Sequence, residues 1–179
     1  MNLPPLDGSP ATGSLPPGFL GRLNQVCMVT HDLYRTARGM LDLGIGPWAV
    51  YTYSPETCTD LTYNARPANF SFRVAFASSR DMAWEIIQPL QGPNIYFDFL
   101  ADHGEGVQHL LFECNEMSWE TKKAALDSAG FACIQSGRWL GRLSFAYYRT
   151  KGTTIEIIDM PPGWQRPEPE EVLENVAGA

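Results

Sequence analysis

Four side chains of the kinds that bind metal ions stand in apolar stretches of the chain: Gln25, Glu85, His109 and Glu156. The two glutamates have similar surroundings, since each is followed by two isoleucines and soon by a proline, a pattern typical of buried β-strands. An ionised carboxylate in such a strand is costly unless a positive group neutralises it. One imidazole, two carboxylates and an amide oxygen suit a divalent cation, because two anionic ligands balance its charge.

The chain repeats this arrangement. Residues 23–29 and 107–112 are both apolar stretches with a polar pair near the start, and they carry Gln25 and His109. These two residues are 84 positions apart, whereas the two glutamates are 71 positions apart, so the first copy contains a longer loop. We interpret the sequence as an internal duplication whose halves each begin and end with a strand that carries a ligand-type side chain.

Each of the four residues also has an ordinary structural interpretation. His109 can be a core histidine, Gln25 a polar group on an edge strand, and the glutamates partners of Arg73, Arg142 or Arg149. For one residue alone the structural interpretation is favoured, but the duplication favours a common metal site. The hypothesis predicts that the four side chains converge inside one curved sheet when the halves pair about a pseudo-twofold axis.

Hydrophobic periodicity and turn residues divide the chain into two β-α-β-β-β units. The first unit is expected to contain a strand, a helix and three strands at residues 23–30, 32–41, 48–53, 70–77 and 82–88. After a short helix at 93–102, the second unit is expected to place the same elements at 107–114, 116–129, 131–138, 143–149 and 153–160. Residues 54–68 are a polar excursion within the first unit.

The predicted fold class is α+β, with two tandem βαβββ modules that form a curved mixed sheet enclosing one site. The domain spans residues 21–162, with modules at about 21–102 and 103–162. Residues 1–20 are expected to be a disordered or extended arm, because they are rich in proline and glycine. The C-terminal tail at 163–179 is expected to be solvated, since it is rich in proline and glutamate.

Composition limits the classes of function. The 179-residue chain has a net charge of −7, which argues against a nucleic-acid or anionic-membrane surface. No apolar run approaches the roughly 18 residues of a membrane span, and the N-terminus lacks signal-peptide features, so we expect a cytoplasmic protein. The cysteines are scattered and expected to be free thiols: Cys27, Cys58, Cys114 and Cys133. For Cys27, on the same strand face as Gln25, packing is favoured over a functional role.

Residues 25–33, 85–90, 104–112 and 155–158, in this order and spacing, resemble the vicinal oxygen chelate superfamily, over roughly residues 23–161. This superfamily includes glyoxalase I, methylmalonyl-CoA epimerase, extradiol dioxygenases and bleomycin-resistance proteins. The run from 85 to 112 is most similar to the epimerase-like branch, where a ligand strand leads through Pro-Leu and a short helix to a Gly-x-Gly-x-x-His strand.

The resemblance implies a glyoxalase-like fold with metal positions at Gln25, Glu85, His109 and Glu156. The epimerase branch usually has histidine at the first position, whereas this Gln/Glu/His/Glu set resembles that of eukaryotic glyoxalase I. The implied cofactor is one divalent ion: zinc, manganese, cobalt, nickel, magnesium or iron. The dioxygenases hold iron with two histidines and one carboxylate, so oxygen chemistry is disfavoured here.

The chemistry that the resemblance implies is proton transfer. The metal binds two neighbouring oxygens of a carbonyl substrate, an adjacent C–H gives up its proton to form an enolate or enediolate, and a carboxylate or metal-bound hydroxide moves that proton. Glu156 is the preferred base and Glu85 the other candidate. A methylmalonyl-CoA epimerase would be expected to have a further acid around residues 70–76, where this chain has none, and we assign no glutathione-binding surface.

The candidate substrate-contacting residues are four aromatic side chains and one arginine: Trp48, Trp84, Trp139, Tyr147 and Arg73. The aromatic residues indicate an apolar or aromatic small or biosynthetic metabolite, with ordinary core packing as the alternative. The arginine is a candidate for binding a carboxylate. His31 is expected to cap the first helix.

The sequence therefore predicts a metal-dependent lyase or isomerase, epimerase-like in its chemistry, that acts on a small-molecule substrate. The alternative is a metal-free, resistance-type protein of the same fold that binds a hydrophobic ligand. A third class is a structural or regulatory protein without chemistry. Neither a nucleic-acid nor a membrane partner is expected, and a homodimer is expected by analogy with the superfamily.

Overall fold

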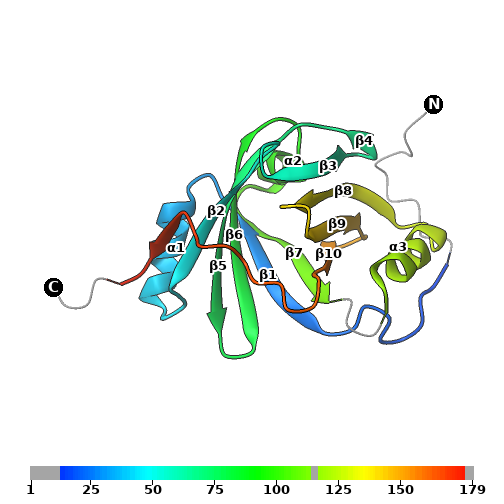
Figure 1. Cartoon of the computed structure of the whole chain (residues 1–179), viewed down its shortest axis with the longest axis horizontal. Coiled ribbons are helices and arrows are strands. Elements are labelled where there is room, and N and C mark those ends of the chain that lie inside the picture. The colour runs from blue at the N-terminus through cyan, green and yellow to red at the C-terminus, as the bar shows by residue number, and fades with distance from the viewer. Residues whose placement is uncertain (1–12, 114–116, 176–179) are drawn as a thin grey trace.

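A computed structural model describes residues 13–113 and 117–175 of the chain (Figure 1). Its strands are β1 (Leu23–Val29), β2 (Trp48–Tyr53), β3 (Cys58–Tyr63), β4 (Arg66–Pro67), β5 (Ser71–Ser79), β6 (Met82–Gln91), β7 (Gly106–Glu113), β8 (Ala132–Trp139), β9 (Leu143–Arg149), β10 (Thr154–Asp159) and β11 (Glu171–Leu173). Its helices are α1 (Leu33–Asp42), α2 (Ile95–His103) and α3 (Trp119–Ser128). No helix in these described ranges is long and apolar enough to cross a membrane.

All strands belong to one curved mixed sheet in the order β11-β2-β5-β6-β1-β7-β10-β9-β8-β3-β4. Within the first module β1 pairs in parallel with β6, and within the second β7 pairs in parallel with β10. The two modules meet where β1 runs antiparallel to β7 at the centre of the sheet. This symmetric arrangement confirms the predicted α+β fold of two βαβββ modules.

The sheet has a concave inner face and an outer face that is covered by two helices. Alternate residues of each strand point inward, and on the inner face they join with α2 in the largest hydrophobic cluster of the molecule's described part. On the outer face, α1 covers the first module and α3 covers the second, each over a separate apolar cluster (Figure 1). Side chains on the inner strand positions are therefore brought together from both modules.

The predicted polar excursion at residues 54–68 contains two further strands. β3 pairs with β8 of the other module, and β4 folds back on β3. Cys58 and Leu61 of β3 are buried in the inner core. The local sequence did not indicate these strands, because their pairing partner lies about seventy residues further along the chain.

The two ends of the domain are attached more firmly than the sequence predicted. Residues 163–175 were expected to be solvated, and most of them are exposed; in addition, this segment crosses the open side of the sheet and ends in β11, which pairs with β2 (Figure 1). At the other end, Leu15, Phe19 and Leu20 pack against the cluster under α3. Residues 1–12 and 176–179, parts of the predicted arm and tail, lie outside the described residues.

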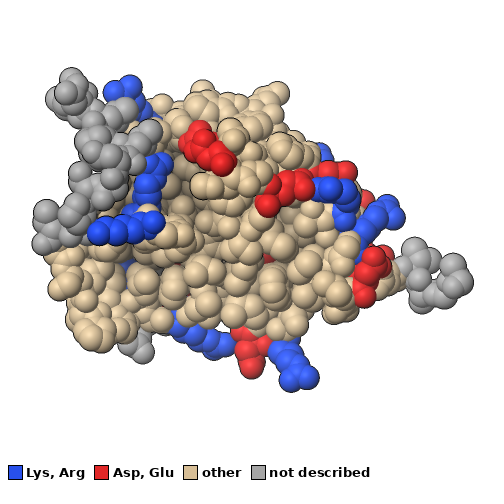
Figure 2. Space-filling model, turned by 180° about the vertical axis from the view of Figure 1, so that it is seen from behind, with Lys and Arg blue, Asp and Glu red and all other residues tan. Residues whose placement is uncertain are grey.

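The charged side chains are spread out rather than gathered. On the face opposite to that of Figure 1, Lys and Arg side chains lie mainly toward the edges, Asp and Glu side chains lie between them in the upper part, and the centre shows neither (Figure 2). The cysteines that the structure describes are free thiols, as predicted: Cys27, Cys58 and Cys133. Cys114, the fourth cysteine, lies outside the described residues.

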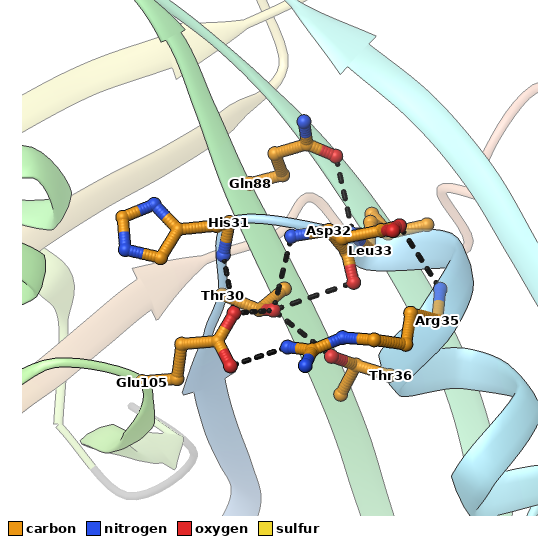
Figure 3. Close-up of polar contacts among 8 residues, drawn as sticks. All are labelled: Thr30, His31, Asp32, Leu33, Arg35, Thr36, Gln88 and Glu105. Atoms are coloured by element: carbon orange, nitrogen blue, oxygen red, sulfur yellow. Dashed lines mark hydrogen bonds and ion pairs between the residues drawn. The ribbon is translucent and has the colours of Figure 1, made fainter.

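A polar junction joins the start of α1 to the turn before β7, and so links the two modules (Figure 3). The Glu105 carboxylate accepts hydrogen bonds from the Thr30 hydroxyl at 2.7 Å and the His31 backbone N–H at 2.8 Å, and it pairs with the Arg35 guanidinium. The predicted cap of α1 is wrong by one residue, because Asp32 is the N-cap and accepts from the Arg35 backbone N–H at 3.0 Å. Asp32 suits this position because its short carboxylate reaches the free N–H groups of the first turn.

We expect Glu105→Gln to lower the free energy of unfolding at pH 7 by about 1 kcal/mol, a value reduced for the partial exposure of this carboxylate. The hydrogen bonds from Thr30 and His31, followed by that from Arg35, lower the pKa of Glu105 from 4.5 to about 2. A lowered pKa stabilises the fold above pH 4.5, and this contribution is lost as the pH falls toward 2.

Denaturant unfolding at pH 7, 4 and 3 measures this effect. The difference between wild type and Glu105→Gln is expected to shrink as the pH falls, while Asp102→Asn, an exposed control in α2, changes little at any pH. An equal penalty at all three pH values would show that the ionised carboxylate does not stabilise the junction.

Candidate metal centre

The structure brings the four predicted ligand residues together on the inner face of the four central strands. Gln25 comes from β1, Glu85 from β6, His109 from β7 and Glu156 from β10, and these strands are neighbours in the sheet. The His109 Nε2 atom lies 3.1 Å from the Glu85 Oε2 atom and 3.0 Å from the Glu156 Oε2 atom. Gln25 lines the same small cavity as both glutamates. The predicted convergence is therefore present.

This cluster is almost fully shielded from solvent. The exposed fraction is 0% for His109, 4% for Gln25 and Glu156, and 5% for Glu85. The cavity between Gln25 and the glutamates has a volume of about 20 Å³, which is room for one water molecule or one ion. Two buried carboxylates at such a place require positive charge close by.

The buried polar atoms of the cluster fit a bound cation. Four atoms lack a hydrogen-bond partner among the described residues: Gln25 Nε2, Glu85 Oε2, His109 Nε2 and Glu156 Oε2. The carboxylate oxygens are close to Nε2, but neither accepts a well-directed hydrogen bond from it. Ligand atoms held at about 2.1 Å in adjacent corners of an octahedral ion lie about 3 Å apart, which matches these separations. Rotation of the Gln25 side-chain amide by half a turn places its oxygen where Nε2 now lies, facing the cavity.

Gln108 fixes the orientation of the histidine ring. Its Oε1 atom lies 2.6 Å from His109 Nδ1, and because an amide oxygen only accepts, Nδ1 carries the proton. The register between β1 and β7 slips at this point, where Cys27 pairs with His109 and Met28 with Val107. In such a bulge two consecutive residues oppose one residue of the neighbouring strand, and the strict alternation of faces is interrupted. Both Gln108 and His109 are therefore buried. The Nε2 atom is then directed at the carboxylates, as in histidines that bind metal.

The protonation of the cluster follows from its burial and charge. Burial alone would lower the pKa of His109, but the adjacent carboxylate of Glu156, followed by that of Glu85, outweighs burial and raises this pKa from 6.5 to about 9. Burial raises the pKa of Glu156 above its ordinary value, and His109 offsets only part of that change. With both carboxylates ionised, even a protonated histidine leaves one negative charge in the cavity.

Cys27 is a potential ligand for which the sequence favoured packing over a functional role. Its Sγ atom, a Glu85 oxygen and a His109 ring nitrogen all lie within 4.8 Å of one another. The strand register explains this, because Cys27 pairs with Glu85 on one side and with His109 on the other. Burial, and then the charge of Glu85, raise the pKa of the Cys27 thiol. Its spacing of two residues from Gln25 already placed both side chains on one face of the strand.

Aromatic side chains form most of the wall around the cluster. Tyr147, one of the predicted substrate residues, lines the small cavity, and its ring centroid lies 4.9 Å from that of His109. Its hydroxyl accepts a hydrogen bond from the Tyr96 hydroxyl at 2.9 Å. Trp139 lies behind this wall, stacked on Tyr53 with centroids 4.5 Å apart. Tyr53 lines the cavity together with Phe72, Phe76 and Phe145.

Three predicted substrate residues lie away from the site. Trp48 and Trp84 pack in the cluster beneath α1, on the outer face of the sheet. The Arg73 guanidinium lies over the ring of Tyr34 in α1, 5.5 Å from its centroid. Since successive residues of a strand point to opposite faces, the inward position of Glu85 excludes an inward position for Trp84. These three predictions are therefore wrong.

A second cavity adjoins the cluster and has a volume of about 310 Å³. Gln25, Phe76 and Arg166 line both cavities and form their common wall. The larger cavity is big enough for a small metabolite, whereas the smaller one is not. The larger cavity therefore adjoins the cluster at Gln25.

The two paired modules share one inner face. This face carries buried imidazole, carboxylate and amide groups, which form a single polar site at the centre of the fold. The chain belongs to the glyoxalase/bleomycin resistance protein/dioxygenase superfamily, whose family model matches residues 24–148. No curated protein sequence matches the chain significantly.

Solved structures with the same fold are only distantly similar in sequence. A hypothetical protein from Bacillus halodurans C-125 has a TM-score of 0.61 and 13% identity, over 81% of this chain and 98% of that one. Methylmalonyl-CoA epimerase from Mycobacterium tuberculosis has a TM-score of 0.59 and 18% identity, over 85% and 96%. A variant of the Streptomyces coelicolor methylmalonyl-CoA epimerase, in complex with 2-nitronate-propionyl-CoA, has a TM-score of 0.56 and 17% identity, over 76% and 95%.

Proposed function

We propose that the protein is a metal-dependent lyase or isomerase that moves a proton from a carbon next to a carbonyl group. The observation that carries this proposal is the buried cluster, in which two carboxylate oxygens lie 3.0 and 3.1 Å from one imidazole nitrogen without a directed hydrogen bond. The ligands would be Gln25, Glu85, His109 and Glu156. A divalent ion bound there would polarise the carbonyl oxygen and stabilise the negative charge of an enolate or enediolate.

The residues of the chain have separate roles in this proposal. Gln108 holds the His109 ring with Nε2 toward the carboxylates, and the aromatic wall excludes water from the reacting atoms. Glu156 is the proposed base, because burial favours its protonated form and so helps it to accept a proton. Glu85 occupies the equivalent position in the other module and is the second candidate for the base.

The substrate is proposed to occupy the larger cavity and present its carbonyl group to the cluster past Gln25. Superfamily members of similar fold act on small molecules, and the structure of the Streptomyces coelicolor enzyme contains the coenzyme A derivative 2-nitronate-propionyl-CoA. The strand β5 contributes Phe76, Ala77 and Ser78 to the wall of this cavity and has no carboxylate along its length. A reaction with one base is therefore favoured over one that needs a second acid on β5.

Exchange of substrate hydrogen with solvent deuterium tests the proposal. Purified protein, stripped of metal and reloaded with zinc, manganese, cobalt, nickel, magnesium or iron(II), is incubated in deuterium oxide with a panel of carbonyl compounds. At least one combination is expected to show exchange that requires the ion. Stoichiometric metal without exchange across the panel would contradict the catalytic step, and no metal would contradict the site.

A metal-free ligand-binding protein is the second candidate. Its supporting observation is that protonated His109 neutralises part of the cluster charge without any ion. Absence of bound metal after reloading, together with tight binding of an apolar ligand, would favour this candidate. The homodimer and the cytoplasmic location expected from the sequence stay predictions.

A further inference from the structure

The segment after β10 crosses the open side of the curved sheet as a strap, which we define as residues 163–173 (Figure 1). Trp164 packs edge-on against Trp139, with ring centroids 5.7 Å apart. The Tyr51 hydroxyl donates to the Pro167 carbonyl oxygen at 3.1 Å. Arg166 lies between these two anchors, so its backbone is held in place over the site.

The far end of the strap is tied to β2 and α1. The Glu170 carboxylate accepts hydrogen bonds from the Thr52 backbone N–H at 2.6 Å and the Thr52 hydroxyl at 2.9 Å. The Glu171 carboxylate accepts from the Tyr34 hydroxyl at 3.0 Å, and β11 pairs with β2. Both acidic residues are therefore engaged elsewhere, and neither pairs with Arg166.

Arg166 is placed to bind an anion at the mouth of the site. Its guanidinium lies over the Phe76 ring, 4.1 Å from the ring centroid, and it lines both cavities. Within residues 13–113 and 117–175, no carboxylate forms an ion pair with it. Stacking on an aromatic ring orients the guanidinium while leaving its N–H groups free for a carboxylate or a phosphate.

We propose that Arg166 recognises an anionic oxygen group of the substrate, a carboxylate or a phosphate, while the carbonyl group of the same molecule lies near Gln25. The substrate class is thus an acidic carbonyl compound small enough for the 310 Å³ cavity. As a description of the substrate, this inference rests on the proposed function, since a carbonyl at Gln25 reacts only if the cluster is catalytic. Anion binding by Arg166 does not itself require the ion, so the two can be tested separately.

Titration calorimetry with phenylpyruvate and its methyl ester tests this role. Both probes carry the same ring and ketone, but only the acid is charged. Wild type is expected to bind the acid at least about tenfold more tightly than the ester, as a charge-assisted hydrogen bond predicts. Arg166→Gln is expected to remove this preference, and Arg38→Gln, an exposed arginine on α1, to keep it.

Phenyl phosphate distinguishes the two anions, because tighter binding of this probe with the same dependence on Arg166 would identify a phosphate rather than a carboxylate. Absence of binding of both anions to wild type would overturn the proposal, as would an acid preference that survives Arg166→Gln. Metal content is measured on the same samples. A preference for the acid that depends on Arg166, in protein that binds no metal, would support anion binding by Arg166 and contradict the proposed function. Stoichiometric metal without this preference would contradict anion binding alone.

Discussion

His109→Ala is expected to lower the affinity for a divalent ion by more than about 100-fold, because loss of an outer-shell partner alone costs about 10-fold to 100-fold. His109 is the central residue of the cluster, since its Nε2 atom lies within 3.1 Å of an oxygen from each glutamate. Without the imidazole, two buried carboxylates and one amide remain, and water must fill the place of the ring. Elemental analysis after dialysis against a metal buffer measures the loss.

His103→Ala is the matched control, because His103 lies exposed at the end of α2. It is expected to bind metal as wild type does. Circular dichroism shows whether His109→Ala is still folded. A folded His109→Ala protein that retains one ion per chain would show that the ion binds elsewhere.

Glu156→Gln is expected to reduce the rate of metal-dependent deuterium exchange by about 100-fold to 10,000-fold, the range that general base catalysis contributes. Glutamine keeps an oxygen that can face the ion but cannot accept a proton at neutral pH. The rate is therefore measured at saturating metal and expressed per bound ion, which separates loss of the base from loss of affinity. Glu85→Gln, treated in the same way, is expected to retain more activity.

Glu120→Gln, an exposed carboxylate on α3, is expected to leave the exchange rate unchanged. If Glu85→Gln loses more activity per bound ion than Glu156→Gln, the base is Glu85. If both variants exchange at the rate of wild type, neither carboxylate moves the proton.

The duplication in the sequence was sufficient to predict the module order and the meeting of the four polar residues. Glu85 and Glu156 each stand in a strand whose other inward positions are apolar, such as Ile87 and Ile158. Because a strand alternates with a period of two, this pattern fixes the face on which each glutamate lies. The pairing of β1 with β7 then follows from the pseudo-twofold relation of the halves.

Other features depend on contacts that a local pattern does not contain. The strap is rich in proline and glutamate, a composition typical of solvated tails, and its order comes from distant partners such as Thr52 for Glu170. Arg166 was missed for this reason, because its place over the site depends on the path of the strap. Trp48 and Arg73 were assigned to the site because the sequence did not show which face of their strands is inward.

The approach of Cys27 to the cluster also required the structure. The sequence placed this residue on the face of Gln25, but its distance from Glu85 and His109 depends on the pairing register of three strands. If the proposed centre binds an ion with Cys27 as a deprotonated thiolate, this soft donor would favour zinc, cobalt or nickel over magnesium.

Anomalous diffraction from crystals grown with zinc or manganese tests the metal centre most directly. The proposal predicts one strong peak in the small cavity, within about 2.0–2.6 Å of donor atoms of Gln25, Glu85, His109 and Glu156. A map without a peak there, from crystals whose chain contains one ion per molecule at another place, would contradict the proposed centre and the proton-transfer chemistry that depends on it.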